Sequence, residues 1–416
     1  MLRPSAFYNV RMSAIPPIEI DAHGLSPLGM SPAQFLARYW QRRPLLIRNA
    51  FPDFVSPVSP DELAGLACEP DALARIVRRE RLSASDDPAQ SRWHLQSGPF
   101  AESDFANLPE HDCSLLVQDV DKWDADVAPL LDAFAFLPRW RIDDIMVSFA
   151  EPGGSVGPHV DQYDVFLLQA HGRRRWRIDS RAGADTALRT DSELKLLRRF
   201  TPDADWLLQP GDMLYLPPGM PHHGEAVDAC LTLSVGMRAP ATGELVGDLA
   251  EHLAEAMAET ERYRDPDLVP ATDPFEIDAA AMTRLRTALG PLGTLDERAL
   301  RDWFGKFITR YRSAALPDAG AKPRTPESLA RMLGEGRTLA RHPFARSAWT
   351  RDGRRGRLFV AGESWAMGMR SASTLAAARR IDAAAFVALD RDAHAALSQL
   401  LARGWYQLQR KTRSRP

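Results

Sequence analysis

The pattern of apolar positions changes character along the chain near residue 242. Before it, short runs rich in β-branched and aromatic residues alternate with Pro and Gly, which predicts strands joined by tight turns. Such short strands and frequent turns indicate a β-sandwich or a small barrel. We interpret the runs on either side of Ala170-His171-Gly172 as one hairpin. The five clearest runs are 144–149, 164–168, 176–178, 212–216 and 231–235.

The segment before residue 140 mixes helical and extended patterns, with a helix start at Asp61, and we expect it to wrap the barrel. After residue 242 the apolar spacing becomes helical. Leu245, Leu249 and Leu253 share one helix face, and a second helix is predicted for residues 277–289. A further apolar face serves either an oligomer contact or packing on the same chain. It consists of Trp303, Phe304, Phe307 and Ile308.

The last part of the chain begins with a predicted linker, because residues 315–326 hold three prolines. Beyond the linker, an extended pair around Leu358 and Trp365 is flanked by helices, one of them predicted for 383–402. That order of elements is typical of a winged-helix module. We therefore expect a mixed α+β protein that divides into residues 1–240, 241–314 and 315–416.

Composition excludes several classes of protein. The 416 residues are 45% hydrophobic and 26% charged, as in an ordinary globular protein of more than one domain. No apolar run is long enough to cross a membrane, and the first residues lack a secretory pattern, so we expect a cytoplasmic protein whose natural start is Met1 or Met12. The three cysteines are odd in number and far apart, which favours reduced thiols. A net charge of −3 makes direct nucleic-acid binding an unfavoured interpretation.

The candidate chemistry starts with His159 and Asp161, which leave the same face of a strand because they are two residues apart. A proline-stiffened turn delivers His222 as a third ligand. Two imidazoles and one carboxylate suit non-heme iron(II), because they leave coordination positions open, although a zinc hydrolase is the alternative. Adjacent strand residues point to opposite sides, so only one of His222 and His223 can bind the metal; we take His222 as the ligand and expect His223 to face solvent or to support the site from behind.

A buried arginine is the second candidate feature. Strand alternation in HGRRRWRI places Arg174 on the apolar face with Trp176 and Ile178. An arginine there is costly unless it meets an anion, and the carboxylate of 2-oxoglutarate suits its two-pronged guanidinium. The alternative is a buried salt bridge to Asp144 or Asp179.

Several long runs of sequence carry a family resemblance. They are SPDELAGLA (59–67), WRIDDIMVSF (140–149), PGGSVGPHVDQYDVF (152–166), GRRRWR (172–177), PGDMLYLPPGMPH (210–222) and VGMRAPATGELVGDLA (235–250). On these runs the chain resembles the Jumonji-C oxygenases, and among them the bacterial ribosomal oxygenases that hydroxylate an arginine of a large-subunit ribosomal protein.

The resemblance implies a jelly-roll, cupin-like double-stranded β-helix, then a helical segment that forms a homodimer, then a C-terminal winged helix. It implies that His159, Asp161 and His222 bind Fe(II) and that Arg174 holds the distal carboxylate of 2-oxoglutarate, with O2 as the other cosubstrate. The implied target is the β-carbon of an arginine in the ribosomal protein numbered sixteen. The chain departs from the family where His223 replaces an acidic residue and Ala150 a serine that would hydrogen-bond the cosubstrate.

We expect Gln162 and Tyr163 to form walls of the substrate pocket. We also hypothesise that acidic side chains attract a basic partner. These are Asp119, Asp121, Asp124 and Asp126.

Other functions stay open at this point. A ribosomal-protein histidine hydroxylase or a lysine demethylase would use the same three metal ligands, and only the substrate pocket separates them. A cupin-like metal enzyme without 2-oxoglutarate would leave Arg174 unimportant. A non-enzymatic winged-helix module that binds nucleic acid or protein would tolerate loss of the metal ligands.

Overall fold

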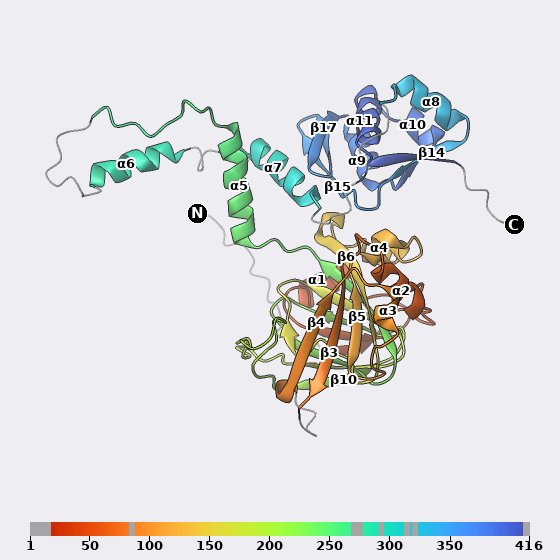
Figure 1. Cartoon of the computed structure of the whole chain (residues 1–416). Coiled ribbons are helices and arrows are strands. Elements are labelled where there is room, and N and C mark those ends of the chain that lie inside the picture. The colour runs from red at the N-terminus through yellow and green to blue at the C-terminus, as the bar shows by residue number, and fades with distance from the viewer. Residues whose placement is uncertain are drawn as a thin grey trace, which may run out of the picture. The chain divides into compact units, whose positions relative to one another are not determined.

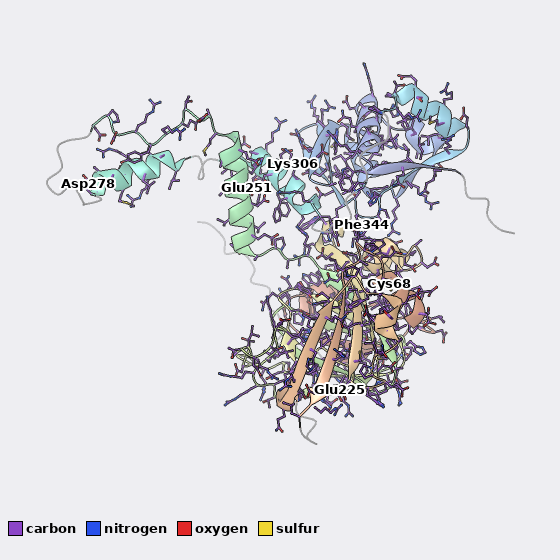
Figure 2. The ribbon with its side chains drawn as sticks, in the orientation of Figure 1. Cys68, Glu225, Glu251, Asp278, Lys306 and Phe344 are labelled. Atoms are coloured by element: carbon purple, nitrogen blue, oxygen red, sulfur yellow. The ribbon has the colours of Figure 1, made fainter. Side chains whose placement is uncertain are left out.

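The computed structural model describes residues 18–82, 88–267, 278–290, 295–311, 317 and 323–410. The chain divides into two compact units, with the boundary between Ala239 and Pro240 (Figure 1). This boundary lies beside the predicted one at residue 240. A separate helical segment spanning 241–314 stays a prediction. Figure 2 adds the side chains to the same view.

The N-terminal unit is mainly β-structure. Its helices are α1 (Pro32–Arg38), α2 (Pro60–Ala67), α3 (Glu102–Phe105) and α4 (Val120–Trp123), with 3-10 turns at Pro88–Gln90, Ala128–Phe134 and Arg139–Arg141. Its strands are β1 (Glu19–Asp21), β2 (Leu45–Arg48), β3 (Ala74–Arg81), β4 (Ser91–Ser97), β5 (Cys113–Val117), β6 (Ile142–Ala150), β7 (His159–Val160), β8 (Val165–His171), β9 (Arg174–Ile178), β10 (Ala204–Leu208), β11 (Met213–Leu216), β12 (Pro221–Ala226) and β13 (Cys230–Met237). The five strands predicted from the clearest runs are confirmed as β6, β8, β9, β11 and β13.

These strands form two sheets. One has nine strands in the order β1-β2-β11-β8-β13-β6-β5-β3-β4, and the other has four in the order β10-β9-β12-β7. The predicted hairpin around His171 is wrong: β8 pairs with β11 and β13, whereas β9 pairs with β10 and β12. The chain crosses between sheets there because both strands carry apolar faces that pack across the core. This alternation of consecutive strands between sheets is that of a double-stranded β-helix.

The segment before residue 140 does more than wrap the barrel. Its strands extend the nine-stranded sheet at both edges, with β1 and β2 at one and β5, β3 and β4 at the other. The predicted helix start near Asp61 is confirmed by α2, whose first turn is closed by a capping box between Ser59 and Glu62. The same device, between Ser31 and Gln34, starts α1.

A buried carboxylate anchors the segment that joins β7 to β8. Asp164 is fully buried, and it accepts hydrogen bonds from the Tyr215 hydroxyl (2.6 Å) and from Gln41 Nε2 (2.9 Å). Arg141 Nη2 lies 3.3 Å from the same carboxylate. A buried charge held by three partners is costly to move, so Asp164 fixes the position of the segment between β7 and β8.

The C-terminal unit contains seven described helices and two small sheets. The helices are α5 (Thr242–Ala256), α6 (Ala279–Ala288), α7 (Glu297–Thr309), α8 (Pro326–Gly334), α9 (Met369–Ala377), α10 (Ala383–Val387) and α11 (Arg391–Ala402). The strands are β14 (Arg337–Arg341), β15 (Ser347–Asp352), β16 (Arg355–Val360), β17 (Glu363–Met367), β18 (Arg380–Ile381) and β19 (Tyr406–Arg410). They form sheets of order β18-β14-β19 and β15-β16-β17.

Most helical predictions for this unit are confirmed, with two changes. The predicted helix 383–402 is two helices, because the Asp390 side chain caps a new helix start at α11. Pro326 begins α8 instead of belonging to a linker. Most of the rest of the predicted linker lies outside the described residues. The predicted extended pair is confirmed as β16 and β17, with Gly362 in the turn between them.

The apolar face of α7 packs on its own unit. Trp303, Phe307 and Ile308 are buried, and a side chain at Gly305 would collide with the ring of Phe359 on β16. The Trp303 indole also donates a hydrogen bond to Asp248 of α5 (2.8 Å). Of the two interpretations of this face, the structure shows packing within the chain. In the described ranges, no helix combines the length and apolar character needed to cross a membrane.

Candidate metal centre

His159, Asp161 and His222 come together as the metal interpretation requires. His159 on β7 and His222 on β12 are directly opposite each other in the antiparallel register. Asp161 Oδ2 lies 3.8 Å from His159 Nε2 and 3.7 Å from His222 Nε2. One ligand atom from each residue lies within 4.8 Å of the other two, which is close enough for a single ion to bridge all three.

Backbone carbonyls fix both imidazoles in the orientation that a metal needs. His159 Nδ1 lies 2.9 Å from the carbonyl oxygen of Gly157, and His222 Nδ1 lies 2.8 Å from that of Met220. With Nδ1 donating to a carbonyl, each Nε2 is left as a lone-pair donor toward Asp161. Burial lowers the pKa of His222 to about 4, so the ring is neutral at pH 7, which is the form that ligates metals.

Arg174 lies buried on β9 with Trp176 and Ile178, as the alternation predicted. Its Nη2 donates to the Gly224 carbonyl (3.2 Å), but Nε and Nη1 are buried without a hydrogen-bond partner. The two salt-bridge alternatives fail. Asp179 pairs with Arg181 (2.7 Å), and Asp144 accepts a hydrogen bond from the backbone amide of Asp119, the residue before α4 (3.0 Å).

A buried guanidinium with two unused donor atoms is costly, and burial lowers its pKa. An anion with two oxygens would relieve that cost. Arg174 lines the same cavity as the three metal-ligand candidates, and this cavity has a volume of about 220 Å³. The donor set and the unpaired arginine therefore fit a metal together with a small carboxylate ligand.

Tyr163 also lines this cavity, with 40% of its surface exposed, and it lies beside Asp161. Gln162 is exposed and does not line the cavity. The structure therefore places Tyr163 at the predicted pocket wall and gives no such place to Gln162.

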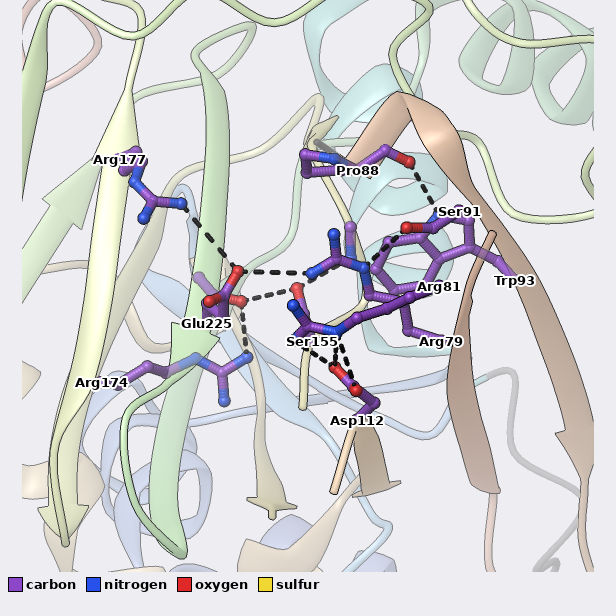
Figure 3. A network of polar contacts seen from close by, with 12 residues as sticks. Arg79, Arg81, Pro88, Ser91, Trp93, Asp112, Ser155, Arg174, Arg177 and Glu225 are labelled. Carbon is purple, nitrogen blue, oxygen red and sulfur yellow. Dashed lines mark hydrogen bonds and ion pairs between the residues drawn. The ribbon is translucent and has the colours of Figure 1, made fainter. Parts of the chain in front are cut away.

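His223 is not exposed to solvent, contrary to one expectation for it. It has 1% of its surface exposed and faces away from the cavity, and burial lowers its pKa well below the usual range. Across β9 it is paired in register with Arg177. Figure 3 shows Arg177 and Arg79 both pointing toward Glu225, which lies on β12 like His223. Arg177 Nη1 lies 4.0 Å and Arg79 Nη1 3.6 Å from Glu225 Oε2. His223 thus lies beside a partly buried charged layer, on the face of the sheet opposite the candidate metal ligands.

A serine that the sequence analysis did not identify links the two halves of the site. Buried Ser155 donates through Oγ to the Gly224 carbonyl (2.7 Å), the same oxygen that orients Arg174 (Figure 3). The hydroxyl also accepts from the Gly157 amide (2.9 Å), and the Gly157 carbonyl holds His159. The run PGGSVGPH contains this serine, but only the fold brings Gly224 beside it.

The hypothesis of an acidic docking surface needs correction. The side chains of Asp119 and Asp121 are only 6% and 7% exposed, and both pair with Lys122, at 2.7 and 3.3 Å. Asp124 accepts from two nearby backbone amides, and of the four only Asp126 is exposed. The carboxylates of Asp119, Asp121 and Asp124 stabilise α4 and the turn after it, so they are not free to attract a basic protein, and Asp126 alone does not make an acidic surface.

Different carboxylates face the cavity. Asp143 and Asp144 line it together with apolar Leu116 and Met146. Burial raises the pKa of Asp144 to about 7. The cavity wall thus combines apolar surface with two acidic groups, one of which titrates near neutral pH.

Comparison with known proteins agrees with this geometry. A Jumonji-C domain family matches residues 129–245, and a ROXA-like winged-helix family matches residues 292–407. The ribosomal protein uL16 3-hydroxylase of Escherichia coli is 38% identical over 307 residues, which cover 74% of this chain and 79% of that protein. This chain belongs to the ribosomal oxygenases of the Jumonji-C family. A probable ribosomal oxygenase of Haemophilus influenzae is 38% identical over 243 residues, covering 58% of this chain and 56% of its own length.

Solved structures give the same assignment over nearly the whole length of this ribosomal oxygenase. YcfD, a ribosomal oxygenase from Escherichia coli in complex with cobalt and 2-oxoglutarate, has a TM-score of 0.74 and 35% identity, covering 91% of this chain and 98% of that chain. A complex of YcfD with cobalt and succinic acid gives the same coverage and TM-score at 34% identity. The expected order of a cupin-like domain and a C-terminal winged helix is confirmed.

Proposed function

We propose that this oxygenase uses Fe(II), O2 and 2-oxoglutarate to hydroxylate the β-carbon of an arginine in the bacterial ribosomal protein uL16, in the cytoplasm. The observation that carries the proposal is the pair of unused guanidinium donors of Arg174 in the cavity that holds the three metal-ligand candidates. The relatives named for a uL16 hydroxylase and for 2-oxoglutarate complexes support it.

Three side chains would hold the iron: His159 and His222 through Nε2, and Asp161 through one carboxylate oxygen. Arg174 would hold the distal carboxylate of 2-oxoglutarate through Nε and Nη1. Bound Fe(II) supplies the oxidising chemistry, in which 2-oxoglutarate and O2 yield succinate and CO2 and one oxygen atom enters a C–H bond of the substrate. The protein's part is to orient the ligands and exclude water.

The cavity wall favours an arginine as the residue that enters. Its guanidinium carries a permanent charge, which Asp143 and Asp144 can neutralise, while Leu116 and Met146 can contact the methylene groups. Tyr163 at the exposed side can cover the inserted side chain. A histidine side chain is shorter and uncharged at pH 7, so it would bring no cationic group to these carboxylates.

We further propose that the chain forms a homodimer through its helical segment. In α6, Met282, Leu285 and the adjoining Leu289 are 39%, 40% and 50% exposed, and a shared apolar face of this kind is typical of a contact surface. Leu285→Glu should convert a dimer to a monomer in light scattering, with Thr283→Glu on the same helix as the control. A wild-type monomer at high concentration would contradict the proposal.

Mass spectrometry of a uL16 peptide incubated with the protein, Fe(II), 2-oxoglutarate and O2 tests the main proposal. We expect the mass of one oxygen atom to be added to an arginine, dependent on 2-oxoglutarate and lost in Asp161→Ala. Succinate formation without peptide oxidation would retain the oxygenase and reject this substrate. Oxidation of a histidine would favour the histidine hydroxylase, and neither product would favour a metal enzyme without 2-oxoglutarate or a binding module.

A further inference from the structure

The charge of the chain is divided unequally between its parts. Residues 323–416 contain 18 Arg and Lys residues against seven Asp and Glu residues, a formal charge of +11. The preceding 322 residues therefore carry −14, since the total is −3. The net charge of the whole chain argued against binding to a polyanion, but that average hides a strongly basic C-terminal region.

Several of these arginines gather at one end of the C-terminal unit. The strands β15 and β16 form a hairpin whose two-residue turn contains Arg354, and Arg351 lies opposite Gly356 across it. The first residue of α9, Met369, packs directly on Gly356, which brings Arg370 to the same end. We call Arg351, Arg354 and Arg370 the hairpin arginines.

The hairpin arginines are exposed and uncompensated. None of the three forms an ion pair within the part of the chain that the structure describes. The acidic groups nearby already have partners. Asp352 pairs with Arg357 (3.1 Å), and Asp392 pairs with Arg355, the residue after Arg354.

Beside the hairpin lies a shallow cleft of about 220 Å³ whose other arginines are already paired. Arg298, Arg301 and Arg357 pair there with Asp352, Glu297 and Asp302, so the unpaired charge at this end comes from the hairpin arginines. Guanidinium groups bind phosphate oxygens through two parallel hydrogen bonds, which makes arginine suited to nucleic-acid backbones. Every basic residue among 323–410 is an arginine.

We propose that the hairpin arginines form a docking surface for the phosphate backbone of RNA. The choice of RNA rests on the proposed function, because ribosomal RNA is the binding partner of a ribosomal-protein substrate. Contacts of this kind position a protein without reading sequence. The surface would hold the enzyme on an RNA-bound substrate and would leave the reaction with a free peptide unchanged.

The experiment measures binding of the full-length protein to a fluorescein-labelled RNA hairpin by anisotropy across a series of salt concentrations. The test variant is Arg351→Glu/Arg354→Glu/Arg370→Glu. The matched control, Arg324→Glu/Arg331→Glu/Arg337→Glu, makes the same charge change at exposed arginines without ion pairs elsewhere in the unit. Circular dichroism melting checks that both variants fold like the wild type.

We expect the test variant to weaken RNA binding at least about tenfold more than the control does. The slope of log affinity against log salt concentration should fall in magnitude by about 2 to 3, because three phosphate contacts are lost. Equal losses in both variants would overturn the assignment of the surface, and no binding by the wild type at low salt would overturn RNA binding. Tighter binding to phosphatidylglycerol vesicles than to RNA would overturn the choice of partner.

Peptide hydroxylation by the same proteins separates this proposal from the main one. We expect the test variant to hydroxylate the free uL16 peptide at the wild-type rate. Failure of the wild type in that reaction would refute the proposed function and leave the RNA measurement unaffected.

Discussion

The two faces of the four-stranded sheet β10-β9-β12-β7 use charged residues in opposite ways. On the inner face, Arg174 is buried with two unused donors beside His222. On the outer face, Arg177 shares the carboxylate of Glu225 with Arg79. Both faces hold buried polar atoms without a hydrogen-bond partner, but the outer arginines have a carboxylate close by, whereas Arg174 forms no ion pair with any described residue. The difference shows that a buried charge without an ionic partner can mark a binding site, and adjacent residues of one strand can be tested against each other.

The largest expected effect comes from the two adjacent histidines of β12. His222→Ala should reduce turnover by on the order of a thousandfold or more, because a metal ligand is lost, while His223→Ala should retain activity within about tenfold. Turnover measured by succinate formation, together with Co(II) binding by calorimetry, checks this. Metal binding that survived in His222→Ala and disappeared in His223→Ala would transfer the ligand role to His223.

The next effect compares two arginines on opposite faces of β9. Arg174→Ala should raise the KM for 2-oxoglutarate by about a hundredfold, since a buried charged contact is removed, and leave Co(II) binding intact. The matched change Arg177→Ala removes a charge from the outer face and should alter this KM less than about threefold. A KM that did not change in Arg174→Ala would remove this residue from the cosubstrate site.

A pH effect of about tenfold is expected for the substrate between pH 6 and pH 8. The pKa of Asp144 is raised to about 7 by burial, so its carboxylate forms and attracts a cationic substrate only as the pH rises through that value. The KM for the peptide should therefore fall with rising pH and then level off. Asp144→Asn should have a flat profile, and a profile unchanged in that variant would exclude Asp144 from substrate binding.

The smallest effect is expected from the hydroxyl that joins the two halves of the site. Ser155→Ala should raise the KM for 2-oxoglutarate about fivefold, with a smaller change in kcat, because the carbonyl that orients Arg174 loses one of its donors. Ser91→Ala provides the control, since this buried serine bonds Arg79 in the outer layer. Equal changes in kcat and KM for both serines would show a merely structural role.

Much of the candidate metal centre could be predicted from the sequence, because its residues are related by short spacings along the chain. Residues two apart share a strand face, which placed His159 with Asp161 and Arg174 with Trp176 before the fold was known. The choice of His222 over its neighbour came instead from the resemblance of the run PGDMLYLPPGMPH to the family. Within the N-terminal unit, five short apolar runs predicted the positions of β6, β8, β9, β11 and β13, whereas the other eight described strands of that unit were not predicted individually.

What local patterns could not supply was the pairing between distant segments. The β8–β9 connection looked like a hairpin because its turn residues suit one, yet the partners of each strand come from elsewhere in the chain. Asp119 and Asp121 looked like surface acids because the neighbouring Lys122 gives no sign in the sequence that all three side chains are buried. The link from Ser155 to Gly224 joins residues far apart in sequence, so only the folded chain reveals it.

The facing positions of His159 and His222 imply that a metal bound to both would also stabilise the fold. β7 is only two residues long and lies at the edge of its sheet, where few backbone hydrogen bonds retain it. An ion bound to both histidines would clamp this strand to β12, and the unfolded chain offers no such site. In cells poor in the metal, β7 would therefore be less firmly held to β12. The supply of the metal would then affect the stability of the enzyme as well as its rate.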